Sequence, residues 1–313
     1  MALSIAFLLC SLSYSTSVSE YTYAANNPNE DRMVSGTLDS LTYAGVFDGH
    51  GGQAVSQLLA QALPSFVQQH LTALSKQDSV ESTATQLFDE LEAKVLASTE
   101  EICPNDECSI GACATVAFVT KDWLAVANTG DCQAVLVRRT ASGFIGENLC
   151  PLHSANNPAE QEKLKLAHPD DPNIIRCRRA CYVKGRLMPT RSFGDFHLKY
   201  AAYSQLSEFR GPYITHQPDV ETRRITADDL FLVLGTDGLW DELSPQAVAD
   251  LLMQDPADPT RDLVEAALQE ASRQIEVSVD DLRQIPPGKR RRYHDDITAV
   301  VVPLQATATR YEL

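Results

Sequence analysis

The chain has 313 residues, of which 44% are hydrophobic and 22% are charged, and its formal net charge is −16. This composition is that of a globular protein with a large core, and because no linker, repeat or low-complexity block divides the chain we expect one domain. The negative charge disfavours nucleic acid and anionic membrane as partners, since both repel an acidic surface. Such acidity is typical of a highly soluble protein and also of one that gathers carboxylates around divalent cations.

The chain begins with an apolar run, Ala2–Leu12. The run is too short to span a bilayer, and it lacks the basic residues that open a secretory signal or fill a transit peptide. A weak secretory signal, a misplaced gene start and a buried first strand all remain open. We therefore separate residues 1–16 from a folded domain over residues 17–305 and a tail over residues 306–313. No other segment predicts a stable membrane span.

Short apolar runs rich in Val, Ile, Thr and Phe predict strands. In chain order they are Leu41–Phe47, Ala114–Val119, Leu124–Ala127, Ala134–Arg138, Leu230–Leu234 and Ile297–Leu304. Stretches with apolar residues at helical spacing lie between them. These predicted helices are Gln53–His70, Thr83–Thr99, Pro158–Ala167, Pro245–Met253 and Thr260–Ile275. Several strands follow one another closely and the helices come in blocks, which predicts stacked antiparallel sheets with helices outside.

Acidic residues recur where these apolar runs stop, usually beside glycine. They are Glu30 and Asp31 in "NEDR", Asp48 in "VFDGHGG", Asp131 in "TGDC", Asp237 in "GTDG", and Asp295 with Asp296 in "HDDIT". One Asp-Gly is commonly a turn, but strand ends of a single sandwich can meet at one edge. Carboxylates gathered there would raise each other's pKa unless a cation neutralised them. Oxygen ligands favour Mg²⁺ or Mn²⁺ over zinc.

The chain contains eight cysteines. In a protein of this length they do not indicate a disulfide framework. Two pairs are close in sequence, Cys103 with Cys108 and Cys177 with Cys181, but neither has a partner pair at the spacing of a zinc site. We therefore expect reduced thiols.

Together these stretches resemble the metal-dependent protein phosphatase 2C family of serine/threonine phosphatases. The matching pieces include "NEDR", "YAGVFDGHGG", "AVANTGDCQAVLVR", "FLVLGTDGLWDELS" and "HDDITAVVV", in family order over roughly residues 17–304. "AANNPNEDR", "AEQEKLKLAHPDD", "LMPTRSFGDFHLKY" and "RRRYHDDIT" resemble more finely the pyruvate dehydrogenase phosphatase-like branch and related plant phosphatases. The resemblance implies an α+β fold, a four-layer α-β-β-α sandwich of two antiparallel β-sheets flanked by helices. It leaves the location open between mitochondrial and cytoplasmic, with secretion disfavoured.

The resemblance also implies a centre that binds two Mg²⁺ or Mn²⁺ ions. The positions that match the family's metal ligands are Asp31, Asp48, Asp237 and Asp295, with the backbone carbonyl of Gly49; Glu30 would support a metal-bound water, and Asp131 with Asp237 would serve a third, weaker ion. Water activated by the metal pair would attack a phosphoserine or phosphothreonine of a phosphoprotein substrate. His50, beside Asp48, would protonate the leaving group as general acid. We expect a monomer.

The chain departs from the family pattern at several positions. Asn26 stands where many family members have an arginine that binds phosphate. Asparagine has neither the positive charge nor the paired N–H donors of the guanidinium group. We therefore expect Asn26 to offer phosphate only a hydrogen bond. Cys132-Gln133 replace the usual Ser-Arg. These departures keep open a second hypothesis, a catalytically silent phosphoprotein-binding protein on the same fold. A two-metal hydrolase of small phosphoesters is a third alternative. Lys199–Tyr213 and Gly288–Tyr293 are candidate substrate contacts, or else solvated loops.

Overall fold

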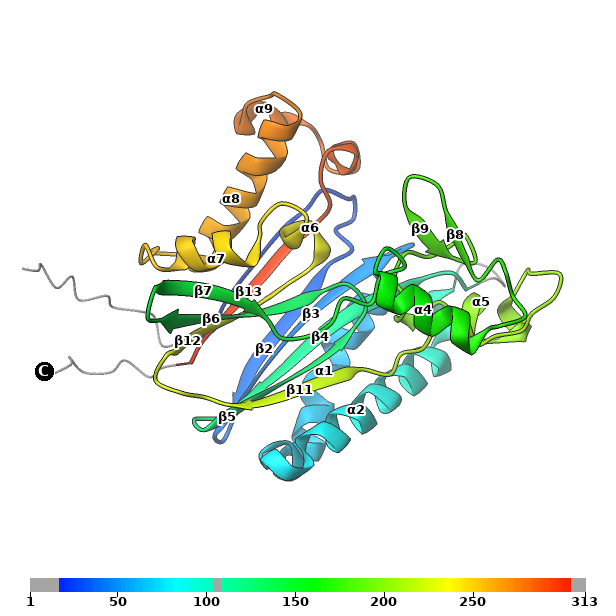
Figure 1. Ribbon diagram of the computed structural model, residues 1–313, viewed down its shortest axis with the longest axis horizontal. Coiled ribbons are helices and arrows are strands. Elements are labelled where there is room, and N and C mark those ends of the chain that lie inside the picture. The colour runs from blue at the N-terminus through cyan, green and yellow to red at the C-terminus, as the bar shows by residue number, and fades with distance from the viewer. Residues whose placement is uncertain (1–16, 104–107, 305–313) are drawn as a thin grey trace, which may run out of the picture.

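The structure is a computed structural model that describes residues 17–103 and 108–304 (Figure 1). The apolar N-terminal segment, residues 1–16, and the tail after residue 304 lie outside these ranges, so the predictions made for them stay predictions. In the described part of the chain, no helix is long and apolar enough to cross a membrane.

The first of two large sheets contains both the first and the last strand of the domain, which pair with each other. It has five antiparallel strands in the order β1-β13-β12-β6-β7. Their bounds are β1 Ser19–Tyr23, β6 Gln133–Thr140, β7 Gly143–Asn148, β12 Asp229–Gly235 and β13 Ile297–Pro303. Tyr23 pairs with Ile297, so the segment that follows β1 lies beside the segment that precedes β13. This pairing brings residues near position 30 next to residues near position 295.

The second sheet contains the most deeply buried strands. Its order is β11-β5-β4-β3-β2, and a short strand, β10 (Phe193–Gly194), adds to β4. The other bounds are β2 Arg32–Leu38, β3 Leu41–His50, β4 Gly111–Val119, β5 Trp123–Thr129 and β11 Asp219–Arg224. Every residue of β4 and β5 is buried because both faces of the sheet are covered.

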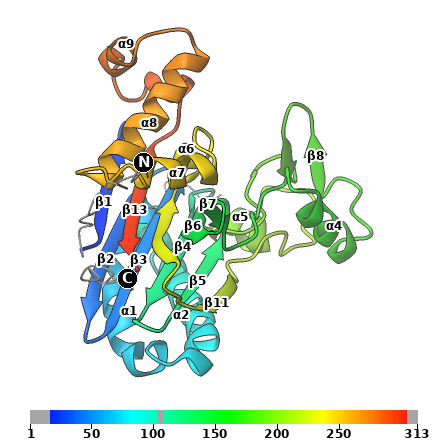
Figure 2. The same ribbon diagram turned by 60° about the vertical axis from the view of Figure 1, so that its left-hand side comes forward.

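Helices cover the outer faces of both sheets (Figures 1 and 2). Helices α1 (Ala54–Leu74) and α2 (Gln77–Ala97) pack on the second sheet, whereas α7 (Pro245–Leu252) and α8 (Pro259–Gln274) pack on the first. A third apolar layer lies between the sheets and includes Val46, Val126, Leu136, Leu232 and Val300. The predicted four-layer α-β-β-α sandwich is therefore confirmed.

The remaining elements are short and lie mostly outside the sandwich. They are α3 Thr99–Ile102, α4 Pro158–Ala167, β8 Ile175–Cys177, β9 Cys181–Val183, α5 Phe196–Lys199, η1 Ala201–Tyr203, α6 Asp237–Trp240, α9 Val279–Gln284 and η2 Arg290–Arg292. Strands β8 and β9 form a two-stranded hairpin that stands away from the sandwich (Figure 2).

Most predicted elements are confirmed, with shifted ends. Helix α4 has the predicted bounds, while α2 begins six residues before the predicted Thr83. The Ser244 hydroxyl accepts a hydrogen bond from the Ala247 amide, as expected of a helix N-cap. The main correction concerns Asp48: β3 does not stop at Phe47 but continues to His50, so Asp48 sits within the strand and pairs with Cys113.

The expectation of reduced thiols was wrong for four cysteines. Cys103 is bonded to Cys108 and Cys177 to Cys181. The Cα atoms are 4.9 Å apart in the first pair and 4.0 Å apart in the second, so cysteines that are close in sequence are also close in space here. Among the described residues Cys113, Cys132 and Cys150 are free thiols.

Candidate metal centre and its neighbouring histidine

Strand ends bring most of the predicted acidic residues to one edge of the sandwich. Figures 1 and 2 place the end of β3 and the start of β13 at the same end of the molecule. The side chains that gather there are Asp31 before β2, Asp48 in β3, Asp131 between β5 and β6, Asp237 at the start of α6, and Asp295 before β13, with Glu30 beside them. We call these six residues the carboxylate cluster.

Asp31 is held at the base of the cluster by two threonines. Its Oδ2 accepts hydrogen bonds from the Thr236 hydroxyl at 2.7 Å and the Thr298 hydroxyl at 2.6 Å. The side chain is only 2% exposed. Burial raises the pKa of Asp31 well above its usual range, and the nearby carboxylates of Asp296 and Asp237 add to this shift.

Asp48 and Asp237 face each other across the cluster. Burial raises the pKa of both well above the usual range, and the charges of other cluster members raise it further. Asp131 is 9% exposed, and burial raises its pKa as well. Asp237 Oδ1 is buried without a hydrogen-bond partner. A buried carboxylate oxygen without a donor is costly unless a proton or a cation satisfies it.

Asp296 differs from the cluster, because backbone amides satisfy it. Its Oδ1 accepts from the Ala25 and Asn26 amides at 2.6 Å and 2.8 Å, and its Oδ2 accepts from the Glu30 amide at 2.7 Å. Asp296 thus fixes the loop that carries Glu30 and Asp31.

The Asn26 side chain faces the same pair of aspartates. Its Nδ2 donates to Asp296 Oδ2 at 3.0 Å and lies 3.3 Å from Asp295 Oδ1. A contact between this amide and phosphate stays a prediction, and its observed partners are carboxylates.

The cluster fits a hard cation by its donor chemistry. All its side-chain donors are carboxylate oxygens, the type that Mg²⁺ and Mn²⁺ prefer. One direct cationic contact is an ion pair of 2.6 Å between Arg291 and Asp295. Within the described ranges, no three His, Cys, Asp or Glu side chains are already arranged so as to hold a metal ion. The donor set and the orphaned Asp237 oxygen support a cation site, whereas its coordination geometry stays a prediction.

His50 lies at the end of β3 and contacts an aspartate that the sequence reasoning did not single out. His50 Nε2 is 2.7 Å from Asp195 Oδ2, and the Ser192 hydroxyl donates to the same oxygen at 2.6 Å. The His50 side chain is 27% exposed and the Asp195 side chain 1%. Burial alone would lower the pKa of His50, but the Asp195 carboxylate outweighs it and raises that pKa. The buried Asp195 carboxylate therefore favours the protonated form of the His50 imidazole, which is open to solvent on its other side.

Gly111 leaves the space that this pair occupies. A Cβ atom at Gly111 would lie 2.1 Å from Asp195 Oδ2 and 2.6 Å from His50 Nε2. Any side chain at position 111 would therefore displace the His50–Asp195 pair.

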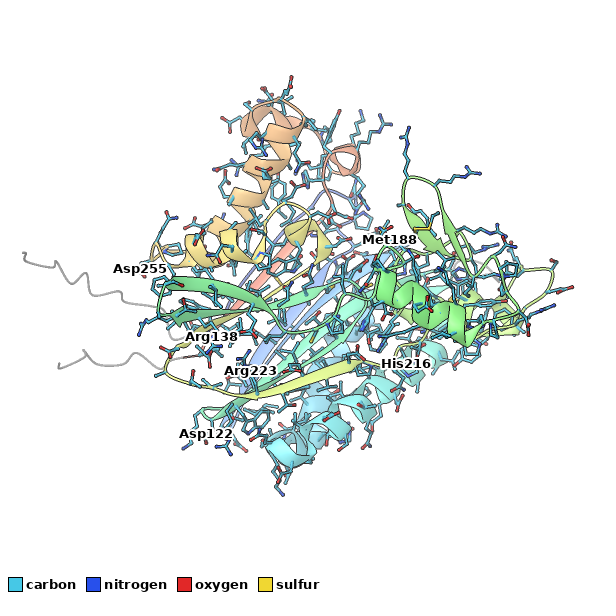
Figure 3. The ribbon with its side chains drawn as sticks, viewed as in Figure 1. Asp122, Arg138, Met188, His216, Arg223 and Asp255 are labelled. Carbon is cyan, nitrogen blue, oxygen red and sulfur yellow. A yellow bond between two sulfur atoms is a disulfide. The ribbon has the colours of Figure 1, made fainter. Side chains whose placement is uncertain are left out.

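A buried ion pair anchors the segment that carries Asp195. Glu92 of α2 accepts from the Lys199 ammonium and, at 3.0 Å, from the Gly194 amide, and Lys199 also donates to the Ser192 carbonyl at 2.7 Å. His216, labelled in Figure 3 close to α2, lies 3.7 Å from Glu92. Lys199 is 6% exposed, so this end of the predicted substrate segment 199–213 holds the site together and does not face substrate.

Glu92→Gln is expected to destabilise the protein by about 3–5 kcal/mol, because it leaves the Lys199 ammonium buried without a counter-charge. Urea unfolding of the purified variant measures the loss. Glu90→Gln on the same helix is the matched control. Glu90 pairs with His70 near the surface, so its loss should cost less than about 1 kcal/mol. Equal effects of the two substitutions would contradict this account.

The basic run Gly288–Tyr293 is partly structural. Arg290 is 7% exposed and donates to the carbonyls of Ile285, Ala24 and Arg283. Arg291 pairs with Asp295, while Lys289 and Arg292 are exposed. This agrees with a loop that balances local carboxylates.

Sequence reasoning also missed Asp241, whose pKa is raised by burial and by Asp131 and Asp295. It lies in "DGLWDEL", one turn of α6 after Asp237, and that spacing was the available signal.

A four-layer sandwich with a buried, oxygen-only carboxylate cluster at one edge defines a domain suited to divalent cations. The family model described as "Protein phosphatase 2C" matches residues 11–277. "Probable protein phosphatase 2C 67" of Arabidopsis thaliana is 34% identical, over 84% of this chain and 74% of the relative. "Probable protein phosphatase 2C 78" of Oryza sativa subsp. japonica is 33% identical, over 91% of this chain and 77% of the relative. The chain belongs to the protein phosphatase 2C family.

Solved structures support the fold. The serine-threonine phosphatase 2C from Toxoplasma gondii superposes with a TM-score of 0.69 at 20% identity, over 92% of this chain and 94% of that chain. A C. elegans sex determining protein gives a TM-score of 0.72 at 18% identity, over 94% of this chain and 66% of that chain. The plant relatives agree with the plant-type part of the finer resemblance, and the pyruvate dehydrogenase phosphatase part stays a prediction.

Proposed function

We propose that this protein is a Mg²⁺- or Mn²⁺-dependent phosphatase that hydrolyses phosphoserine and phosphothreonine in proteins at a two-metal centre. The observation that carries the proposal is the carboxylate cluster with its orphaned Asp237 oxygen, next to the His50–Asp195 pair. Family membership supports the reaction class, and the donor set supports the choice of cation.

Each part of the site has a role in the proposal. Asp31, Asp48, Asp237 and Asp295 would hold the metal pair, with the Gly49 carbonyl; Asp131 would serve a third ion, and Glu30 would orient water. When bound, the cations supply Lewis acidity that makes water nucleophilic near neutral pH and neutralises charge on the phosphoryl oxygens. His50 donates a proton to the departing serine or threonine oxygen, and Asp195 keeps that imidazole protonated and oriented.

Purified protein is expected to release phosphate from a phosphothreonine peptide with Mn²⁺ and to stop when a chelator is added. Phosphate release with and without EDTA, on the peptide and on p-nitrophenyl phosphate, measures this. A folded protein that binds Mn²⁺ in calorimetry but turns over only small esters would favour the small-phosphoester hydrolase. No binding and no turnover would favour the silent phosphoprotein-binding protein.

A further inference from the structure

The β8–β9 hairpin carries a concentration of positive charge that the proposed reaction does not use. Residues 174–187, "IIRCRRACYVKGRL", contain five basic residues and no acidic one, in a chain with 42 acidic and 26 basic residues. The turn between the strands is Arg178-Arg179-Ala180, closed by the Cys177–Cys181 disulfide. Side chains extend from this hairpin into open space (Figure 3).

Three of these arginines surround a hollow. A cavity of about 650 Å³ is lined by Arg176, Arg178, Arg179, Ala180, Tyr182 and Gly185. Arg176, Arg178 and Arg179 are all exposed, and among the described residues none of the three forms an ion pair. Nearby Asp171 is not available to them, because Lys184 pairs with it at 2.6 Å. The three guanidinium groups around this hollow repel each other, and an anion with several oxygens would neutralise that repulsion. The paired N–H donors of a guanidinium group fit the oxygens of a carboxylate or a phosphate.

The hairpin is packed against the segment that positions His50. Val183 of β9, Leu198 of α5, Tyr213 and Ile174 form a small buried core of their own. Leu198 lies three residues after Asp195, and its carbonyl accepts from the Tyr213 amide at 2.9 Å. In Figures 1 and 2 the hairpin stands to one side of the sandwich, next to α4. The hairpin that lines the hollow thus shares its core with the segment that carries Asp195, the partner of His50.

We propose that the arginine hollow binds an acidic segment of the substrate protein that flanks the phosphorylated residue. The proposal rests on the proposed phosphatase function and names its substrate class: phosphoproteins with clustered carboxylates, or a second phosphate, near the target site. Charge complementarity carries the choice of partner, because the rest of this acidic chain repels such a segment and the hollow attracts it.

The test compares phosphothreonine peptides that share one core sequence and differ in the flank. The first set carries four Glu residues either before or after the core. The second set carries four Gln residues at the same positions. In the third set, one phosphoserine replaces the Glu segment. We expect a kcat/KM about tenfold higher for the better acidic peptide than for its Gln counterpart at low salt, falling as the salt concentration rises. The Glu and phosphoserine sets distinguish carboxylate from phosphate as the preferred anion.

The triple variant Arg176→Gln, Arg178→Gln, Arg179→Gln should lose this preference and keep the turnover of the Gln-flanked peptides. The matched control is Lys76→Gln, Lys94→Gln, Lys121→Gln, which removes the same charge from exposed positions at the N-cap of α2, on α2 and in the β4–β5 turn. It should keep the preference. Equal losses in both triple variants, or no preference in the wild type, would overturn the proposal.

Direct binding separates this inference from the phosphatase function. Fluorescence anisotropy of a labelled four-Glu peptide without phosphate needs no catalysis. If no peptide is turned over but binding is still lost only in the arginine triple variant, the proposed function fails and the acidic-segment site stands. If the wild type binds vesicles containing phosphatidylserine through these arginines but does not bind the peptide, the hollow binds a membrane surface and the inference is wrong.

Discussion

Asp48→Asn is expected to lower metal-dependent turnover of a phosphothreonine peptide by about a thousandfold and, in the absence of metal, to stabilise the fold. The first effect follows if Asp48 holds the metal pair. The second follows from the pKa of Asp48, which burial and then the neighbouring carboxylates raise well above its usual 3.8. The folded state then binds more protons than the unfolded state, so the metal-free wild type loses stability as the pH rises from about 4 through the raised pKa.

The measurement is thermal unfolding at pH 5 and pH 8, with EDTA and with Mn²⁺. The metal-free variant should lose less stability than the wild type between the two pH values and should gain much less from Mn²⁺. Asp296→Asn is the matched control, because Asp296 is buried beside the cluster but satisfied by three backbone amides, so its loss should destabilise the protein with or without metal. An Asp48→Asn protein that keeps Mn²⁺-dependent activity would remove Asp48 from the metal site.

The central strands could be predicted from the sequence because burial on both faces makes them continuous apolar runs. Each of the nine residues of β4 is buried, for example. Edge strands were missed for the opposite reason. Strand β11, "DVETRR", has no residue that is fully buried, and its polar composition does not distinguish it from a loop. Strands β1, β2 and β7 are similarly half exposed.

The acidic members of the candidate site could be predicted because each lies within two residues of a strand end and these strand ends share an edge. The partner of His50 could not be predicted in this way. Asp195 is 145 residues away in sequence and adopts a left-handed backbone conformation with φ of 48°. Nothing local in "RSFGDF" indicates that its carboxylate meets His50. The contact depends on β10 pairing with β4 and on Glu92 fixing the segment from another helix.

His50→Ala is expected to slow hydrolysis of a phosphothreonine peptide about a hundredfold while changing hydrolysis of p-nitrophenyl phosphate far less. The alkoxide of threonine is a poor leaving group that needs a proton, whereas p-nitrophenolate departs without one. Metal affinity should be nearly unchanged, because His50 contacts Asp195 and not the carboxylate cluster. Calorimetric Mn²⁺ titration beside the two rate measurements separates a proton donor from a metal ligand.

Asp195→Asn tests the same assignment through the pH dependence of the rate. The Asp195 carboxylate raises the pKa of His50, so its removal should lower that pKa. A general acid acts only while protonated, and the decline of kcat for the peptide at high pH should therefore begin at a lower pH in the variant. Ser192→Ala, which removes a hydrogen bond to Asp195 but no charge, should shift this decline much less. A profile that keeps its position in Asp195→Asn, or a variant that loses Mn²⁺, would show that the pair does not supply the proton.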